Sequence, residues 1–246
     1  YGILPKKQDD AENVVDGLLR QMKLESRPVA LVVKQHSFEP YPLRKSLEKE
    51  FPLTREHAIA LIAEAIPSQA VIISTTGKTS RELFEYRERH NHGHAKDFLT
   101  VGSMGHCSSI ALGIALQQPQ RDVCCFDGDG ALIMHMGALA VIGAKGPKNL
   151  KHIIFNNGSH DSVGGQPTAG FFIDIPKIAL ACGYKSAFFA ENEEQLRNAV
   201  SKLISSQGPA ILEVKVAKGS RKDLGRPTAT PLQNKKAFME FLNNRK

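Results

Sequence analysis

Residues 121–165 limit the possible folds more than any other part of this sequence. Residues 123–126 form a short apolar run, which is typical of a strand buried in a parallel sheet. That run ends at an Asp-Gly-Asp-Gly turn, and a second apolar run, residues 152–155, ends at Asn156-Asn157-Gly158-Ser159. The carboxyl ends of parallel strands lie at one edge of a sheet, so the two polar turns are expected to lie side by side.

The rest of the chain repeats this alternation of strands and helices. Residues 131–143 are apolar or small nearly all round, which predicts one buried helix between the two strands. The pattern predicts an α/β fold, a doubly wound parallel sheet with helices on both faces. Further strands are expected at residues 70–74, 187–189 and 210–216, and helices at residues 57–66, 81–89, 106–117, 174–182, 193–204 and 234–242; residues 97–101 lead into a turn at residues 102–105.

The first 35 residues are expected to be only the end of a domain. Residues 9–22 have helical spacing and residues 29–33 read as a buried strand, which is too little for a domain. The chain also begins with Tyr1, which suggests further residues upstream. We therefore predict a domain remnant at residues 1–35, a linker at residues 36–53, and a domain at residues 54–246 that opens with Thr54 as a helix cap.

Composition and charge exclude several classes of protein. The chain has no run of 18 apolar residues and no signal peptide, so we expect a cytoplasmic protein without a membrane partner. Its four cysteines lack CxxC spacing and are interpreted as buried free thiols rather than a zinc site. The net charge of +7 comes from residues 215–246, with nine Lys or Arg and two acidic residues. This segment has no nucleic-acid motif, so a solvated face is favoured over nucleic-acid binding.

The two polar strand ends carry oxygen ligands. Asp129 and Asn157 are 28 positions apart and suit a Mg²⁺ ion that also holds phosphate oxygens. Other phosphate motifs fit poorly. A P-loop ending at Gly77-Lys78-Thr79 would need glycine at position 72, which is Ile, and a dinucleotide fingerprint would need a small residue at position 133, also Ile.

The Gly-Asp-Gly turn, followed after a strand-helix-strand interval by two asparagines, resembles the thiamine diphosphate motif of thiamine-dependent enzymes. The flanking text is more specific, and it resembles the phosphonopyruvate decarboxylases, a family of thiamine diphosphate-dependent decarboxylases. The matching segments are STTGKTSREL (74–83), DFLTVGSMGHCSSIALG (97–113), DGDGALIMHMGALA (127–140), NNGSHDSVGGQPT (156–168) and DLGRPTATP (223–231).

The resemblance implies a role for each residue of these motifs. Asp129, the Asn157 side chain and the Ser159 carbonyl would bind Mg²⁺, while Asn156 would be structural. The cofactor diphosphate would meet Gly130 and Ala131 at the start of a helix, with the turn Thr75, Thr76 and Gly77 as a second candidate. The turn Gly102, Ser103 and Met104 would support the bent cofactor, with Met104 as the wedge between its rings.

The catalytic residues are less well defined by the resemblance. An anionic substrate needs cations, and Lys78, Arg81, Arg221 and Arg226 are candidates. His106, His135 and His160 lie beside the motifs and could transfer protons. We favour His160 and Arg226, because both lie in polar turns within motif-like text.

The implied activity is decarboxylation of 3-phosphonopyruvate to phosphonoacetaldehyde and CO2. Sulfopyruvate decarboxylation is the alternative, since a few unassigned cations do not separate a phosphonate from a sulfonate. The glutamate that activates the cofactor in this family lies in an upstream pyrimidine-binding domain, of which residues 1–35 would be the remnant. We therefore expect either a homo-oligomer or a partner subunit with a pyrimidine domain, and this chain alone could be an inactive cofactor-binding half.

Overall fold

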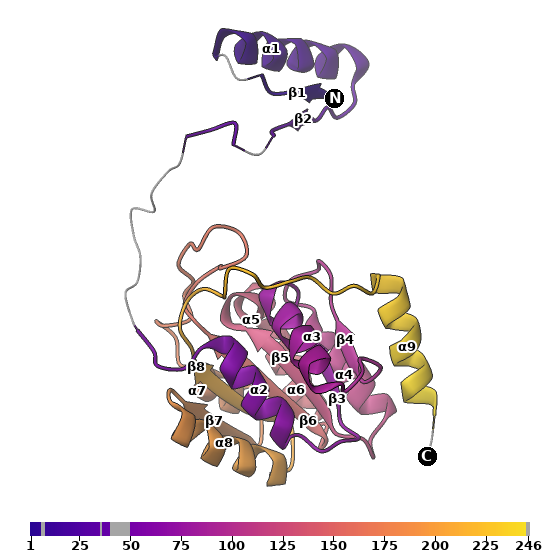
Figure 1. The fold of residues 1–246 in the computed structure, drawn as a ribbon, viewed down its shortest axis with the longest axis vertical. Helices are drawn as coiled ribbons and strands as arrows, with labels where there is room; N and C mark the ends of the chain where they lie inside the picture. The colour runs from indigo at the N-terminus through magenta and orange to yellow at the C-terminus, as the bar shows by residue number, and fades with distance from the viewer. Residues whose placement is uncertain (6–7, 35, 40–49, 245–246) are drawn as a thin grey trace. The chain divides into compact units, whose positions relative to one another are not determined.

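A computed structural model describes the chain except for residues 6–7, 35, 40–49 and 245–246 (Figure 1). The chain divides into two compact units, residues 1–44 and 45–246. The boundary between the units falls outside the described residues, as does most of the predicted linker. The assignment of residues 1–35 to a domain remnant stays a prediction. Near the linker's end Leu53 is buried, and its carbonyl accepts a hydrogen bond from the backbone N–H of Ala217.

The first unit contains one helix and a small parallel sheet. The predicted helix is present as α1 (Gln8–Glu25). The prediction of a buried strand at residues 29–33 is wrong, because β2 (Leu31–Val32) has only two residues and Val32 is 46% exposed. Its single partner among the described residues of this unit is β1 (Gly2–Ile3), which the sequence reading missed. Two short strands cannot bury a strand face on both sides.

The second unit is built on a six-stranded sheet in the order β4-β3-β5-β6-β8-β7, and every pairing in it is parallel. The predicted fold class is therefore confirmed. The four inner strands β3, β5, β6 and β8 are buried on both faces, which explains why they read as continuous apolar runs, whereas Phe189 on the edge strand β7 is 45% exposed. They are β3 (Val71–Ser74), β4 (Asp97–Leu99), β5 (Val123–Gly128), β6 (Leu150–Asn156), β7 (Ser186–Ala190) and β8 (Ala210–Lys215).

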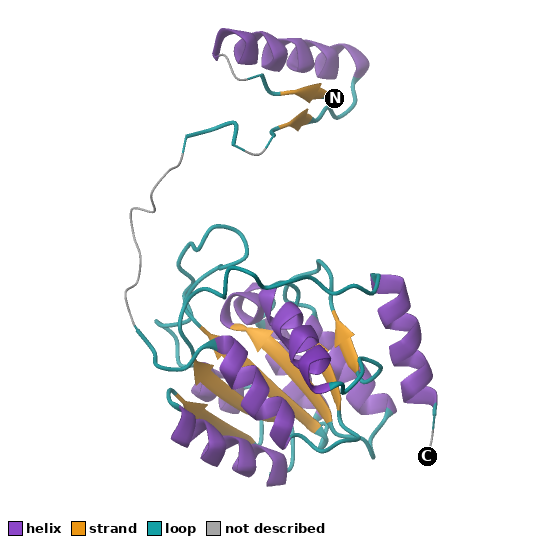
Figure 2. Cartoon of the chain, in the orientation of Figure 1, coloured by secondary structure: helices purple, strands orange, loops and turns teal. Residues whose placement is uncertain are grey.

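Helices cover both faces of this sheet (Figures 1 and 2). Successive residues on a strand point to opposite faces, so the sheet supplies two apolar cores. Ile72 and Phe126 belong to the core under α2, α3 and α8, whereas Ile73 and Cys125 belong to the core under α4 to α7 and α9. The helices are α2 (Arg55–Ala65), α3 (Lys78–His90), α4 (Cys107–Gln117), α5 (Asp129–Met134), α6 (Gly137–Lys145), α7 (Ile175–Ala181), α8 (Glu193–Ser205) and α9 (Pro231–Asn243).

The single buried helix predicted at residues 131–143 is wrong. It is two helices, α5 and α6, separated at His135, whose φ of −132° and ψ of 43° are not helical. His135 packs against the turn before α4, where a Cβ on Gly105 would lie 2.5 Å from its ring. The pair is also not buried all round, because Met134 is 56% exposed and Val141 52% exposed.

The strand order places a crevice at one edge of the sheet. β3 leads through α3 to β4 on one side, and the chain returns through α4 to β5 on the other side of β3. Ligands of doubly wound sheets bind outside the carboxyl ends of the strands at such a reversal. Among the described helices, none is both long and apolar enough to cross a membrane.

Candidate functional site

A cleft lies at the reversal point, outside the carboxyl ends of β3, β5 and β6. Its walls come from the turns after these three strands, the first residues of α3 and α5, Met104 in the turn after β4, and the first residue of α2. The polar turns that the sequence predicted to lie side by side do meet at this cleft. The predicted site residues that line this cleft are Thr75, Thr76, Met104, Asp129, Gly130, Ala131, Asn157, Ser159 and His160.

Asp129 is the carboxylate at the floor of the cleft. It is the first residue of α5 and only 2% exposed. Burial raises the pKa of this carboxyl above its ordinary value of 3.8, and hydrogen bonds from Thr168 and from the backbone N–H groups of Asn157 and Gly130 lower it in part. The carboxylate is thus held in place by groups from both neighbouring turns.

The other acidic residue of this turn, Asp127, faces the core instead. Its carboxylate accepts a hydrogen bond from the Gly128 N–H at 2.9 Å and lies 3.4 Å from His152 Nε2. The side chains of Asp127 and His152 are both fully buried. The sulfur atoms of Cys107 and Cys125 lie 3.4 Å apart beside it. Only the second acid of the turn is therefore offered to the cleft.

The paired asparagines have different surroundings. Asn156 is fully buried, and its amide donates to the Gly170 carbonyl and to Glu213 and accepts from the Gly158 N–H. These bonds engage both ends of its side chain inside the fold. The Asn157 side chain accepts from the Ser159 N–H at 3.0 Å and lines the cleft. Asn157 is therefore the asparagine that can offer an oxygen to a ligand.

Two buried hydroxyls at the cleft have no partner among the described residues. The Thr75 and Ser159 side chains belong to residues that are 4% and 8% exposed, and neither hydroxyl makes a hydrogen bond. Unpaired buried hydroxyls cost free energy, so native structures normally pair them with protein, water or ligand. Both hydroxyls lie in the turns that also carry Thr76 and Asn157, which is where a polyanion with a cation would meet them.

Glycines leave room around these groups. A Cβ on Gly170 would lie 2.5 Å from Asp129 Oδ2 and 2.7 Å from Asn156 Oδ1, so any side chain there would push the carboxylate away. A Cβ on Gly130 would lie 2.7 Å from the His160 ring. The site is therefore close-packed at both glycines, around carboxylate and amide oxygens at Gly170 and around the His160 ring at Gly130.

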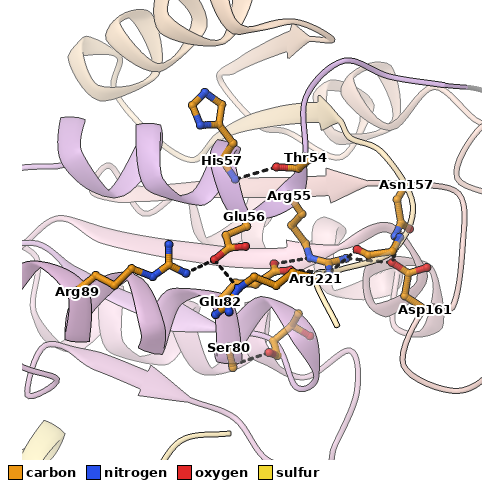
Figure 3. A network of polar contacts seen from close by, with 12 residues as sticks. Thr54, Arg55, Glu56, His57, Ser80, Glu82, Arg89, Asn157, Asp161 and Arg221 are labelled. Carbon is orange, nitrogen blue, oxygen red and sulfur yellow. Dashed lines mark hydrogen bonds and ion pairs between the residues drawn. The ribbon is translucent and has the colours of Figure 1, made fainter. Parts of the chain in front are cut away.

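A buried ion-pair network joins α2 and α3 to the turn after β6, and two of its members, Arg55 and Asp161, also line the cleft (Figure 3). Arg55, which is 6% exposed, makes two hydrogen bonds to Glu82, at 2.7 and 2.9 Å. Its third nitrogen is 3.3 Å from Asp161, and Asp161 accepts a hydrogen bond of 2.7 Å from Asn157. The network thus runs from α2 and α3 to the asparagine that faces the cleft.

Four predicted site residues are not among those that line the cleft in the described part of the chain. Gly77 and Gly102 lie close by, with positive φ values of 102° and 72°, and the Gly102 N–H donates to Thr76. Ser103 is exposed, and so is Arg226. The roles of these four residues stay predictions.

The structure also places the other candidate cations and histidines. Lys78 lines the cleft. Arg81 donates to the carbonyls of Leu224 and Gly225, and Arg221 pairs with Glu56, Glu85 and Asp223, so both fasten the segment before α9. The rings of His106 and His135 pack on each other, with centroids 4.2 Å apart.

Sequence reasoning missed Arg55, Asp161 and Thr168. Asp161 and Thr168 lie within the motif at residues 156–168. Nothing in their spacing, however, indicated that they contact Asn157 and Asp129. Arg55 follows the predicted cap Thr54, whose side chain does accept from the His57 N–H. Only the tertiary fold brings Arg55 to Asp161, 106 positions away.

Comparison with known proteins decides the family. Residues 75–214, more than half of the chain, match the family described as thiamine pyrophosphate enzyme, C-terminal TPP binding domain. The chain belongs to this family. The matched residues include the turns after β3, β5 and β6, so the thiamine pyrophosphate (thiamine diphosphate) domain contains every residue that lines the cleft except Arg55.

Individual relatives agree with this assignment. A phosphonopyruvate decarboxylase of Streptomyces viridochromogenes is 38% identical over 189 residues, which cover 77% of this chain and 46% of that protein. A sulfopyruvate decarboxylase subunit beta of Methanococcus maripaludis is 34% identical over 190 residues, covering 77% of this chain and 98% of that subunit. The chain thus spans less than half the length of the phosphonopyruvate decarboxylases that it matches.

The fold is also found in a solved structure. A putative thiamin diphosphate-dependent enzyme from Mycobacterium smegmatis matches 68% of this chain and 32% of its own, with a TM-score of 0.56 and 23% sequence identity. This likeness shows the fold alone. The resemblance that the motifs indicated is confirmed by the family match and by the phosphonopyruvate decarboxylase relatives.

Proposed function

We propose that this chain forms the diphosphate- and Mg²⁺-binding part of a thiamine diphosphate-dependent decarboxylase that acts on phosphonopyruvate. The observation that carries the proposal is the cleft in which Asp129, Asn157 and the Ser159 turn meet beside the glycine-rich start of α5. Family membership and the similarity to phosphonopyruvate decarboxylases support it.

The residues of the cleft fit a diphosphate held through Mg²⁺. A buried carboxylate and a side-chain amide are hard oxygen ligands, and with the backbone carbonyl of Ser159 they would supply three of six octahedral positions. Phosphate oxygens and water would fill the rest. Asp129, Asn157 and Ser159 are accordingly proposed as the protein ligands of the ion.

The diphosphate itself needs hydrogen-bond donors. The unpaired Thr75 hydroxyl, the neighbouring Thr76 and the backbone at Gly130 and Ala131 surround the same space. Lys78 adds a positive charge at this wall. The two unpaired hydroxyls found at the cleft are the observation that favours an oxyanion there over an apolar ligand.

Bound thiamine diphosphate supplies the carbon nucleophile and the electron sink that decarboxylation of a 2-oxo acid requires. The chain's own residues would position the cofactor and protonate the reacting carbon. Met104, on the wall across from Asn157's turn, would support the cofactor in its bent form. His160, whose ring lies close over Gly130, is our candidate for proton transfer to the reacting carbon.

The substrate's anionic head group sets the specificity that we propose. Arg226, exposed in the segment held by Arg81 and Glu85, is the candidate cation for a phosphonate. Sulfopyruvate is the second candidate substrate, because a relative named as a sulfopyruvate decarboxylase subunit matches this chain over 98% of its own length.

A pyrimidine-binding partner completes the proposal. The relative that matches almost end to end is named as a subunit, whereas the phosphonopyruvate decarboxylases are about twice as long as the matched part. We propose that the activating glutamate comes from a pyrimidine domain, carried either by a longer form of this polypeptide in a homo-oligomer or by a separate subunit.

The test is decarboxylation by the chain together with a pyrimidine domain, assayed with phosphonopyruvate, sulfopyruvate and pyruvate in the presence of thiamine diphosphate and Mg²⁺. We expect CO2 release with phosphonopyruvate to exceed that with sulfopyruvate by at least about tenfold. A preference for sulfopyruvate would establish the second candidate. Activity on pyruvate alone, or rates independent of Mg²⁺, would contradict both.

A further inference from the structure

We propose that Asp161 is a positioning residue that fixes the side-chain amide of Asn157, with Arg55 holding Asp161 in place. The inference rests on the proposed role of Asn157 as a Mg²⁺ ligand. It adds two residues to the site that are neither ligands nor part of the glycine and asparagine motif.

Both ends of the Asn157 amide are already committed by hydrogen bonds. Its nitrogen donates to Asp161 Oδ2 at 2.7 Å, and its oxygen accepts from the Ser159 N–H at 3.0 Å. A flipped amide would place its oxygen against a carboxylate and its NH₂ group against an N–H. Two favourable contacts would become two repulsive ones. The bond to Asp161 therefore selects the orientation in which the oxygen, with one lone pair left, can ligate a cation.

Asp161 can do this because it is itself fixed. Its Oδ2 atom accepts from Arg55 Nη1 at 3.3 Å and from the Gly219 N–H at 2.9 Å, in addition to Asn157. The side chain of Asp161 is 11% exposed. A carboxylate with three donors from three separate segments has little freedom to turn, so its position is a property of the fold rather than of the local turn.

Arg55 closes the arrangement on the other side. Its side chain is 7% exposed, and its guanidinium makes two hydrogen bonds to Glu82 and donates to the Gly219 carbonyl at 3.2 Å. Buried charges are stable only when they are paired and hydrogen-bonded, and this one satisfies two carboxylates. Figure 3 shows the resulting line of contacts from Glu82 through Arg55 and Asp161 to Asn157.

The contacts of Asp161 also distinguish positioning of Asn157 from simple attachment of the segment that contains Gly219. The segment that contains Gly219 is held at other points by carboxylates, for example by Glu85, which pairs with Arg221 and accepts from the Gly225 N–H. Among the described contacts, Asp161 is the carboxylate that joins this segment to Asn157. Loss of Asp161 should therefore affect the metal ligand, and loss of Glu85 should not.

The experiment measures the Mg²⁺ dependence of thiamine diphosphate binding to the 246-residue chain by titration calorimetry, since the chain has no tryptophan to report binding. We expect Asp161→Ala to raise the dissociation constant for Mg²⁺ about 10- to 100-fold, the usual effect of losing a partner of a metal ligand. Asp161→Asn should stay within about fivefold of the wild type, because its amide oxygen still accepts from Asn157, though more weakly than a carboxylate. Glu85→Ala is the matched control and should leave the constant unchanged.

A second readout does not need the cofactor. In ¹H–¹⁵N spectra of the metal-free chain, the side-chain NH₂ pair of Asn157 is identified by its loss in Asn157→Ala. We expect this pair to shift in Asp161→Ala and to stay in place in Glu85→Ala. If Asp161→Ala does not fold, Asp161→Asn still decides, since a tenfold or larger loss of Mg²⁺ affinity in that variant would show an effect of charge and overturn positioning.

The outcomes separate the inference from the function on which it rests. Wild-type chain that binds thiamine diphosphate with Mg²⁺, loses this binding in Asp129→Ala and keeps it in Asp161→Ala would overturn the inference alone. Binding that is indifferent to both Mg²⁺ and Asp129→Ala would overturn the proposed function together with the inference.

Discussion

The two sides of the cleft differ in how firmly this chain builds them. At the ends of β5 and β6, Asp129 and Asn157 are 2% and 3% exposed, and their side chains are held by hydrogen bonds from several turns. Across the cleft, beyond the ends of β3 and β4, Gly102 and Ser103 are exposed and have φ values of 72° and 45°. The Gly102 N–H donates a hydrogen bond to the side-chain hydroxyl of Thr76.

This difference indicates which functions depend on the chain alone. The side that carries Asp129 and Asn157, which we propose to bind the metal, is fixed by contacts within the second unit. A substitution there should therefore change cofactor binding even without a partner. The turn from Gly102 to Met104 has few contacts of its own, so its role should depend on what binds against it. Four experiments, with six substitutions between them, test this contrast.

The largest effect should come from Asp129→Ala. Without its one buried carboxylate ligand, the proposed Mg²⁺ site loses its only formal negative charge among the three ligand groups, and we expect Mg²⁺-dependent binding of thiamine diphosphate to weaken by more than about 100-fold. Calorimetry measures the change. Asp174→Ala, which removes an exposed cap of α7, is the control and should bind as the wild type does.

The two adjacent asparagines should separate stability from binding. Asn156→Ala leaves several buried groups unpaired and should lower the free energy of unfolding by about 3 kcal/mol. Asn157→Ala should cost about 1 kcal/mol of stability and weaken Mg²⁺ binding about 10- to 100-fold. Urea denaturation followed by circular dichroism gives the first quantity. The reverse pattern would mean that the wrong asparagine has been assigned to the cleft.

Two glycines compare the two sides directly. Gly170→Ala would place a Cβ 2.5 Å from Asp129 Oδ2, so we expect it to displace the carboxylate and weaken Mg²⁺ binding about tenfold. Gly102→Ala meets no atom within 4 Å, and its cost of about 1 kcal/mol should come only from a positive φ. Equal losses of Mg²⁺ affinity in the two variants would remove the contrast between the sides.

The smallest effect in the isolated chain is expected for Met104→Ala. Met104 is half-buried at the cleft, so thermal unfolding should change little. Affinity for thiamine diphosphate should fall by only about fivefold, through the apolar surface that the cofactor no longer covers. The same variant should lose much more activity once a pyrimidine domain is present. A large loss of Mg²⁺ affinity would show that this turn belongs to the metal side.

Much of the side of the cleft that carries Asp129 and Asn157 could be predicted from the sequence, because the patterns that mark it are local. The apolar runs that end in Asp-Gly-Asp-Gly and Asn-Asn are complete within a few residues, and a parallel sheet brings strand ends together wherever it forms. The roles proposed for Asp129 and Asn157 needed only the strand assignment and the family pattern, and these roles stay proposals. The structure shows that both side chains are buried and line the same cleft.

What the sequence did not reveal depends on distant contacts. Arg55 and Asp161 are 106 positions apart, and no periodicity links them. The break between α5 and α6 depends on how His135 packs against Gly105, so an apolar and small-residue pattern alone predicted one continuous helix. Residues 29–33 have the apolar pattern of a buried strand, but the first unit has too few elements to cover that strand.

The most direct test of the account is a crystal structure of the chain with thiamine diphosphate and Mg²⁺ bound. The account predicts one Mg²⁺ ion about 2.1 Å from an Asp129 carboxylate oxygen, Asn157 Oδ1 and the Ser159 carbonyl oxygen, with diphosphate oxygens among the other ligands. An ion bound elsewhere, or a diphosphate that reaches the chain without Asp129 and Asn157 as metal ligands, would contradict it.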